Sequence, residues 1–370
     1  MSFTDPPRAS LTDVLSDVLQ KLEEAFRANG LVCKWNEPMS RHTSFKIGGP
    51  AALCVWPTGR QQLITALSLW RELGEGCPLC VLGNGSNVLM ADNGYRGLVI
   101  ITTYAKRVAF EEDDVADRDE FRRRSLYCQV YAECGASLTL LARACGAEDR
   151  ELSGLEFACG IPGTVGGAVV MNAGAYGSDM ERILVSAEYF DLASGEIVRL
   201  MDNEMELEYR HSIFLDHPEW VVLSAVLTLS YGFGEDIRAR MNANLAARHD
   251  KQPLNYPSAG SVFKRPVDNF AGRMVETVGL KGAMIGYAQV SEKHAGFIVH
   301  RTDLGTATAA DVLALVEQVQ NEVEKTYHYR LECEIRYITD GLPRETVVKI
   351  PAETVPSASG PTEPALPSES

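Results

Sequence analysis

Apolar residues recur at helical spacing in the segment LTDVLSDVLQKLEEAFRAN, residues 11–29, and the pattern stops at Gly30. This spacing predicts an amphipathic helix near the start of the chain. Farther along, short apolar runs that are typical of buried strands lie at 51–57, 79–82 and 97–102. A segment of helical period at about 60–73 separates the first two runs, and this β-α-β order predicts a small mixed domain.

Strand-like alternation dominates the middle of the chain. It predicts a sheet-rich unit with strands at 126–134, 183–200 and 218–231 and a helix around 137–145. From about residue 235 the pattern changes to helices, short strands and a loop rich in Gly, Ser and Pro. We expect helices at 237–248, 270–278 and 308–326, strands at 295–299 and 331–338, and the loop at 253–266.

Two segments lack an apolar period. Residues 109–124, AFEEDDVADRDEFRRR, are highly charged and predict a solvated insertion, with a partner site as the alternative. Residues 351–370 are rich in Pro, Ser, Thr and Glu and predict a disordered tail.

Composition narrows the possible classes of protein. A chain of 370 residues suggests two or three domains, and its net charge of −15 disfavours a nucleic-acid binder, which would need a basic face. No run of ~18 apolar residues and no N-terminal apolar signal region appear. Nine cysteines without framework spacing predict reduced thiols and a cytoplasmic location. Cys77 and Cys80 have redox spacing, but they run into a strand, which favours buried thiols over a redox pair.

The first glycine-rich loop is GNGSN at 83–87, and it directly follows the apolar run at 79–82. Its glycines allow backbone N–H groups to converge on an anion, and Ser86 and Asn87 add side-chain donors. The pattern is not a GxGxxG sequence that opens a long helix, so a doubly wound dinucleotide fold is not indicated. Taken alone, the loop is a tight turn as often as a phosphate cradle.

A second glycine-rich segment covers 154–177 and is apolar, with Glu156 as its one charge. A linker would be polar. An apolar, glycine-rich backbone is instead suited to packing against a flat apolar group. Glycine-mediated packing between two elements is the alternative, but a bound planar cofactor explains the length better.

These two loops, together with five further motifs, resemble the UDP-N-acetylenolpyruvoylglucosamine reductase family. The motifs lie in the family's order across about 41–336: RHTSFKIGG at 41–49, YRHSIF at 209–214, PSAGSVFK at 257–264, VSEKHAGF at 290–297 and LECEIR at 331–336. Each would be weak alone, and their common order makes the resemblance specific. The direct passage from Tyr231 into helix resembles the shorter, type II branch.

The resemblance implies an α+β fold. It consists of an FAD-binding domain of the vanillyl-alcohol-oxidase (PCMH) type in two α/β subdomains and a smaller C-terminal α+β substrate domain. The expected division is a helix and lead-in at 1–40, FAD subdomains at 41–101 and 102–232, the substrate domain at 233–345 and a disordered tail at 346–370. The last strand should return to the first FAD subdomain.

The resemblance also assigns the cofactor residues. The first loop would hold the FAD pyrophosphate without a covalent link, through Gly83, Asn84, Gly85, Ser86 and Asn87. The second would lie along the ribityl chain and flavin ring, through Gly160, Ile161, Pro162, Gly163, Thr164, Gly166, Gly167, Ala168, Asn172, Gly174 and Gly177. NADPH is implied as the electron donor and a UDP-sugar as the substrate, with no metal, nucleic acid, membrane or obligate protein partner.

The implied reaction reduces the enolpyruvyl ether of UDP-N-acetyl-3-O-(1-carboxyvinyl)glucosamine to UDP-N-acetylmuramate, with hydride from reduced FAD added at C3 and a proton at C2. The site therefore needs a cation on the substrate carboxylate and a proton donor near C2. The family's motifs assign Arg210 and Glu334 to the carboxylate and Ser261 to the proton. Without the resemblance, Arg210 would be an ordinary ion-pair residue, Ser261 a turn residue and Glu334 one of several solvated charges.

Lys251 matches a lysine that contacts the substrate diphosphate in relatives, and Tyr209 and Lys264 are second choices for the same pocket. Arg265 and His300 stand where other members carry Asn, and His294 is expected to be structural. Two alternatives stay open: an oxidase of the same fold, and a nucleotide-sugar or FAD-binding module without catalysis.

Overall fold

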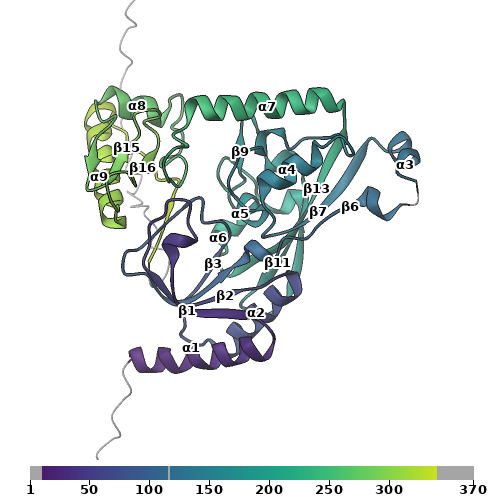
Figure 1. The fold of residues 1–370 in the computed structure, drawn as a ribbon, viewed down its shortest axis with the longest axis horizontal. Coiled ribbons are helices and arrows are strands. Elements are labelled where there is room, and N and C mark those ends of the chain that lie inside the picture. Colours follow the sequence, from purple (N-terminus) through teal and green to yellow (C-terminus); the bar gives the residue numbers. More distant parts are fainter. Residues whose placement is uncertain (1–10, 116, 340–370) are drawn as a thin grey trace, which may run out of the picture.

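Two sheets form most of the N-terminal two thirds of the protein, as shown by the computed structural model, which describes residues 11–115 and 117–339 (Figure 1). The first sheet has the order β1-β2-β5-β3, and β5 is parallel to both of its neighbours. Leu53, Cys54 and Val55 of β2 are fully buried, as in parallel strands that are covered on both faces. The elements of this part are α1 (Leu11–Ala28), β1 (Val32–Pro38), β2 (Pro50–Trp56), α2 (Arg60–Leu73), β3 (Leu79–Leu82), β4 (Val88–Met90) and β5 (Tyr95–Ile101).

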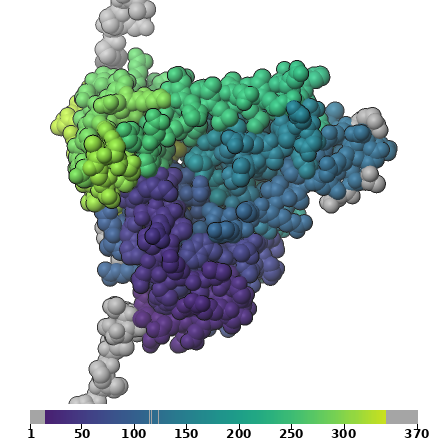
Figure 2. Space-filling view, viewed as in Figure 1, coloured from purple at the N-terminus to yellow at the C-terminus, as the bar shows by residue number. Residues whose placement is uncertain are grey.

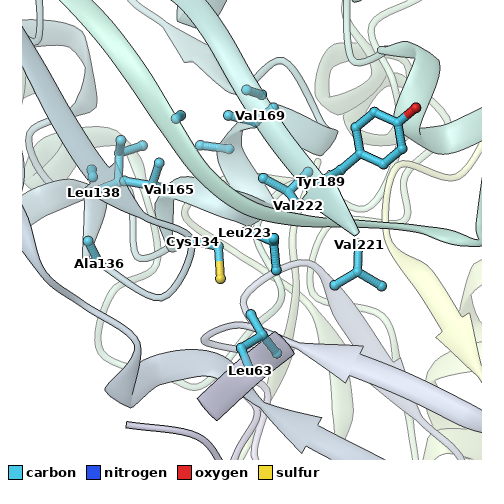
Figure 3. Packing of buried hydrophobic residues seen from close by; sticks show 14 of the residues in the cluster. Leu63, Cys134, Ala136, Leu138, Val165, Val169, Tyr189, Val221, Val222 and Leu223 are labelled. Atoms are coloured by element: carbon cyan, nitrogen blue, oxygen red, sulfur yellow. The ribbon is translucent and has the colours of Figure 1, made fainter. Parts of the chain in front are cut away.

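The second sheet is antiparallel and has the order β12-β11-β13-β7-β6, with β8 also paired to β13. Leu63 of α2 belongs to the same buried cluster as Cys134 and Leu223, so the two sheets share one apolar core (Figure 3). The elements here are β6 (Val108–Phe110), α3 (Arg118–Arg124), β7 (Tyr127–Glu133), α4 (Leu138–Cys145), β8 (Leu152–Ser153), α5 (Val165–Val170), β9 (Gly174–Ala175), β10 (Ser178–Asp179), β11 (Leu184–Asp191), β12 (Ile197–Met201), α6 (Ile213–Asp216) and β13 (Trp220–Tyr231).

The C-terminal part is built around a second apolar core, in which α9 packs on a three-stranded sheet of order β14-β15-β16 and which also includes Phe45, Ile47 and Leu89 of the N-terminal part. The long helix α7 runs from the second sheet to this part along the top of Figure 1. The elements of the C-terminal part are α7 (Gly234–Lys251), α8 (Ala271–Thr277), β14 (Met284–Ile285), β15 (Ala288–Val290), β16 (Ile298–His300), α9 (Ala309–Tyr327) and β17 (Arg336–Ile338).

The chain then returns to the N-terminal part. Strand β17 pairs in parallel with β4, so that Arg336 lies opposite Val88. The carboxylate of Asp92, just after β4, accepts hydrogen bonds from the first two N–H groups of α9, at 2.7 and 3.0 Å. An acidic group at a helix N-terminus satisfies N–H groups that lack a partner within the helix. These contacts bring residues 334–338 beside the first glycine loop.

Most of the predicted helices and strands are confirmed, including α2 and β3 with the predicted bounds. The predicted strand 331–338 is wrong in part, because only β17 at its end is a strand, while Cys333 pairs with Phe263 through a single bridge. The pattern missed β1 and also α5, whose six residues lie inside the apolar glycine segment. The predicted domain boundaries stay predictions, and the predicted tail lies outside the described residues.

The prediction of a solvated insertion at 109–124 is confirmed for its exposed residues, among them Arg118, Asp119, Glu120 and Arg124, and is wrong for Phe110 and Glu112. Strand β6 extends the second sheet, and Glu112 is fully buried. The Glu112 carboxylate accepts hydrogen bonds from Arg122, Arg150 and Tyr231. A buried carboxylate requires such partners, and the charge-rich sequence supplies them within one small cluster. Sequence periodicity cannot detect a polar core of this kind.

Glu112→Gln should lower the unfolding free energy by about 3 kcal/mol, because it leaves two arginines without their buried partner. Burial alone would raise the pKa of Glu112. Hydrogen bonds from Arg122 and Tyr231 and the nearby arginine charges lower it by more, so that the net pKa lies below the usual 4.5. The carboxylate therefore contributes stability above that pH and loses it as the pH falls through the depressed pKa. Calorimetry of both proteins should show the difference in melting temperature shrinking in strong acid.

The matched control is Glu120→Gln, since Glu120 forms an exposed ion pair with Arg124 in the same segment. Exposed pairs of this kind contribute about 0–1 kcal/mol. Equal effects of the two substitutions would contradict a structural role for the Glu112 cluster.

Candidate active site

A cavity of about 1570 Å³ lies where the two sheets and the C-terminal part meet. It is larger than the ~300–1,000 Å³ of a typical small-molecule site. Both glycine-rich loops, the last turn of α7, the 254–261 segment and Glu334 line it. Figure 2 shows the three parts packed around this region, with the C-terminal part in green and the N-terminal part in purple. The size suits a large cofactor together with a second ligand.

The first glycine loop follows β3, and all of its residues from Gly83 to Asn87 line the cavity. Gly85 has φ +58°, and a Cβ added there would lie 2.3 Å from the carbonyl oxygen of His42. A Cβ on Gly83 would lie 2.3 Å from the hydroxyl of Thr164 in the second loop. Asn84 also donates to the carbonyl of Pro162, at 2.6 Å. The two loops therefore form one continuous cradle that only glycine permits at these contacts.

The second loop lines the cavity along most of its length. The predicted cofactor residues on the cavity wall are Ile161, Pro162, Gly163, Thr164, Gly166, Gly167, Ala168 and Gly174. Gly160, Asn172 and Gly177 were predicted with them but do not lie on the wall. Asn172 is 1% exposed, and its side chain bonds to the protein backbone instead. The glycine pattern could not separate residues of this loop that face the cavity from those that support it, and their role in cofactor binding stays a prediction.

Arg210 and Glu334 meet at the cavity wall, although they are 124 positions apart in sequence. The Arg210 Nε donates to Glu334 Oε1 at 2.8 Å, and Nη2 donates to the Gly174 carbonyl at 3.0 Å. A guanidinium has five N–H donors, so three remain for a ligand. Burial raises the pKa of Glu334 above its ordinary value, and the adjacent Arg210 opposes that rise. The pair can present a forked cation to a carboxylate.

Glu334 is also fixed by the first glycine loop. Asn87 Nδ2 donates to the Glu334 carbonyl at 3.1 Å, and the Asn87 carbonyl accepts from Arg336 N–H at 3.0 Å. Glu332, two residues earlier, instead pairs with Lys264 at the surface, at 3.3 Å. Of these two carboxylates, only that of Glu334 lines the cavity.

Ser261 lines the same cavity as the Arg210–Glu334 pair. The chain around it is held on both sides: Ser261 bridges Phe297, and Val262 accepts a hydrogen bond from Glu334 N–H at 2.7 Å. Gly260, with φ +83°, makes the turn that precedes it. The backbone that carries the Ser261 hydroxyl is therefore held in place at the cavity wall.

Only one of the three predicted substrate residues lines the cavity. Lys251, in the last turn of α7, lines the cavity. Tyr209 and Lys264 do not line it: Tyr209 is 55% exposed and accepts from Arg265 N–H, and Lys264 pairs with Glu332.

Sequence reasoning missed Arg248, which lines the cavity one helical turn before Lys251. Burial lowers the pKa of Arg248. Its i, i+3 spacing to Lys251 puts both cations on one face of α7, and that spacing could have revealed it.

Two histidines and two cysteines were also noted in the sequence, without an assigned catalytic role. His300 is buried and contacts the backbone at Phe45 and Ala307. His294 does line the cavity, and burial lowers its pKa. Cys77 and Cys80 are free thiols, as the sequence predicted, and burial raises the pKa of Cys80 to about 12.

Two family models match the chain. Residues 51–201 match the FAD binding domain, and residues 252–338 match the C-terminal domain of UDP-N-acetylenolpyruvoylglucosamine reductase. The chain is 43% identical over 321 residues to the reductase of this name from Caldanaerobacter subterraneus subsp. tengcongensis, covering 87% of this chain and 98% of the relative. It is 44% identical to the one from Agathobacter rectalis, covering 82% and 93%. The chain belongs to the UDP-N-acetylenolpyruvoylglucosamine reductase family.

The crystal structure of the Thermus caldophilus reductase of this family matches with a TM-score of 0.64 and 31% identity, over 84% of this chain and 99% of that one. The predicted fold class is therefore confirmed: an FAD-binding domain of the PCMH type followed by the family's C-terminal domain. The chain is an oxidoreductase with an FAD-binding domain. Within residues 11–115 and 117–339, no helix is long and apolar enough to cross a membrane, and no group of three metal-ligating side chains is found.

Proposed function

We propose that this chain reduces the enolpyruvyl ether of UDP-N-acetyl-3-O-(1-carboxyvinyl)glucosamine to UDP-N-acetylmuramate, a precursor of peptidoglycan, with NADPH as electron donor. The observation that carries this proposal is that the paired Arg210 and Glu334 line the same cavity as Ser261 and both glycine loops. A module that only binds a ligand has no need for a forked cation beside a positioned hydroxyl.

The residues present fit FAD. The first glycine loop packs tightly on its protein side, where a Cβ on Gly83 or Gly85 would collide, and its other side lines the cavity, where backbone N–H groups can meet an anion. Apolar and aromatic side chains, among them Trp70, Phe214 and Trp220, line other parts of the cavity and suit planar rings. When bound, FAD supplies the redox chemistry, which the side chains themselves lack.

The chain's own residues would handle charge and protons. Arg210 would bind the substrate carboxylate through the N–H groups that Glu334 and Gly174 leave open. It would hold the negative charge that develops as the double bond is reduced. Glu334 keeps the guanidinium in place, and Ser261 would donate a proton to C2. Lys251, with Arg248 beside it, would hold the diphosphate of the UDP-sugar.

The visible spectrum of the purified protein tests this function. NADPH should bleach a yellow flavin, and the enolpyruvyl UDP-sugar, without oxygen, should restore the colour. Recovery of colour by oxygen with turnover of a phenol or sugar would favour the oxidase alternative. A flavin that NADPH does not bleach would favour a binding module.

Gly85→Ala should weaken FAD binding by about tenfold or more, equivalent to ~1.4 kcal/mol. The added Cβ meets the His42 carbonyl and also disfavours the positive φ at this position. The FAD content after dialysis and the dissociation constant measure the effect. Gly279→Ala is the matched control: Gly279 has φ +76° with nothing within 4 Å of an added Cβ. Equal loss of FAD in both variants would show that backbone strain, rather than the cradle, is responsible.

Acid precipitation should leave the flavin in the supernatant, and flavin on the pellet would contradict a non-covalent site.

A further inference from the structure

Arg210 lies at the tip of a two-residue turn. Glu208 and His211 exchange backbone hydrogen bonds, at 3.2 and 3.1 Å, and leave Tyr209 and Arg210 between them. Arg210 has φ +57°, in the left-handed region that is unfavourable for a residue with a side chain. A turn of this kind keeps its shape only where the surrounding structure holds it.

The Asn172 side chain stabilises this turn through a hydrogen bond to its backbone. Its Nδ2 donates to the Glu208 carbonyl at 2.9 Å, which is the carbonyl at which the turn begins. Its Oδ1 accepts from Glu181 N–H at 3.0 Å, so the amide is fixed at both ends. The side chain is 1% exposed and lies off the cavity wall. The second amide N–H is therefore kept away from a ligand in the cavity by burial.

The same loop holds Arg210 a second time. Two residues after Asn172, the Gly174 carbonyl accepts from Arg210 Nη2 at 3.0 Å. A neighbouring contact, from the Ser212 hydroxyl to the Val170 carbonyl at 2.7 Å, fastens the other end of the turn to α5. The second glycine loop thus fixes the backbone and the guanidinium of Arg210 together, and the guanidinium in turn meets Glu334.

We propose that Asn172 is a positioning residue for the reaction: by holding the Glu208 carbonyl it sets the turn that aims Arg210 at the substrate carboxylate. The proposal rests on the proposed role of Arg210. It gives the second glycine loop two separate tasks, because the residues on the wall face the cofactor while Asn172 faces the catalytic turn.

Asn172→Asp tests the proposal with little change in shape. Asp tolerates a positive φ much as Asn does, and its carboxylate still accepts from Glu181 N–H. The donor that faces the Glu208 carbonyl becomes an oxygen, which repels that carbonyl when the carboxyl group is ionised. In stopped-flow experiments, flavin reoxidation by the enolpyruvyl UDP-sugar should slow by ~10²-fold, the loss expected from a misplacement of about 1 Å. Flavin reduction by NADPH and FAD content should change by less than about twofold.

The matched control is Gln289→Glu. Gln289 is also a buried amide that donates to a carbonyl, of Gly282, and accepts from an arginine, Arg301, but it lies in the C-terminal part off the cavity wall. This variant should lower the melting temperature without slowing reoxidation. Slowing of both half-reactions by Asn172→Asp, or loss of its FAD, would show a structural role and overturn the proposal.

A double-mutant cycle separates this inference from the proposed function. If Asn172 acts through Arg210, Asn172→Asp should slow reoxidation by no more than about twofold in an Arg210→Ala background. A full additional ~10²-fold loss there would contradict the inference alone. Normal reoxidation in Arg210→Ala by itself would remove the role of Arg210 on which this inference rests, whereas failure of the enolpyruvyl UDP-sugar to reoxidise the wild-type flavin would contradict the proposed function.

Discussion

Ser261→Ala should separate the two half-reactions. NADPH should bleach the flavin at a near-normal rate, because that step does not involve C2 of the substrate. Reoxidation by the enolpyruvyl UDP-sugar should slow by ~10²–10⁴-fold, the usual contribution of a general acid. Stopped-flow absorbance of the flavin measures both rates in one protein. The geometry supports this expectation, since pairing to Phe297 and to Glu334 fixes the backbone on both sides of Ser261.

Ser261→Cys is the informative companion variant. A thiol is a stronger acid than a hydroxyl but is larger, so reoxidation should recover in part. Equal slowing of both half-reactions in Ser261→Ala would indicate a damaged flavin pocket. An unchanged reoxidation rate would remove Ser261 from the mechanism.

Local patterns predicted the fold well wherever packing follows periodicity. The helix α2 and strand β3 have the predicted bounds, because each has one period and a clear end. The pattern failed where glycine or charge hides the structure. Helix α5 is rich in glycine and valine, which are poor helix formers, yet its buried residues hold it against the second sheet. The sequence pattern indicated a solvated Glu112, because charged residues are rarely buried unless they are paired and the pattern does not show the pairing.

The candidate site could be predicted only in part from the residues themselves. Motif order identified Arg210, Glu334 and Ser261, and the structure brings all three to one cavity. No local pattern shows that Asn172 faces a backbone carbonyl rather than a cofactor, or that Lys264 pairs at the surface. Those outcomes depend on contacts between segments that are distant in sequence.

Arg210→Ala should slow reoxidation of the flavin by about 10²–10³-fold, as expected when one donor to a developing negative charge is removed. Turnover should fall more than binding, because the contact strengthens in the transition state. Arg210→Lys should restore only part of the rate, since an ammonium cannot form the fork that the guanidinium offers a carboxylate. If Arg210→Ala raised only the substrate KM, the role of Arg210 would be limited to ground-state binding.

The same variant should also change how stability depends on pH. Burial already raises the pKa of Glu334, and removing Arg210 takes away the charge that opposes this rise. A carboxyl group whose folded pKa is raised contributes stability while it is protonated, and that contribution is lost as the pH rises through the folded pKa. The melting temperature of Arg210→Ala, relative to wild type, should therefore fall as the pH rises. Adding Glu334→Gln should abolish this pH dependence, because the amide does not ionise, and a pH dependence that survives in the double variant would assign the effect to another group.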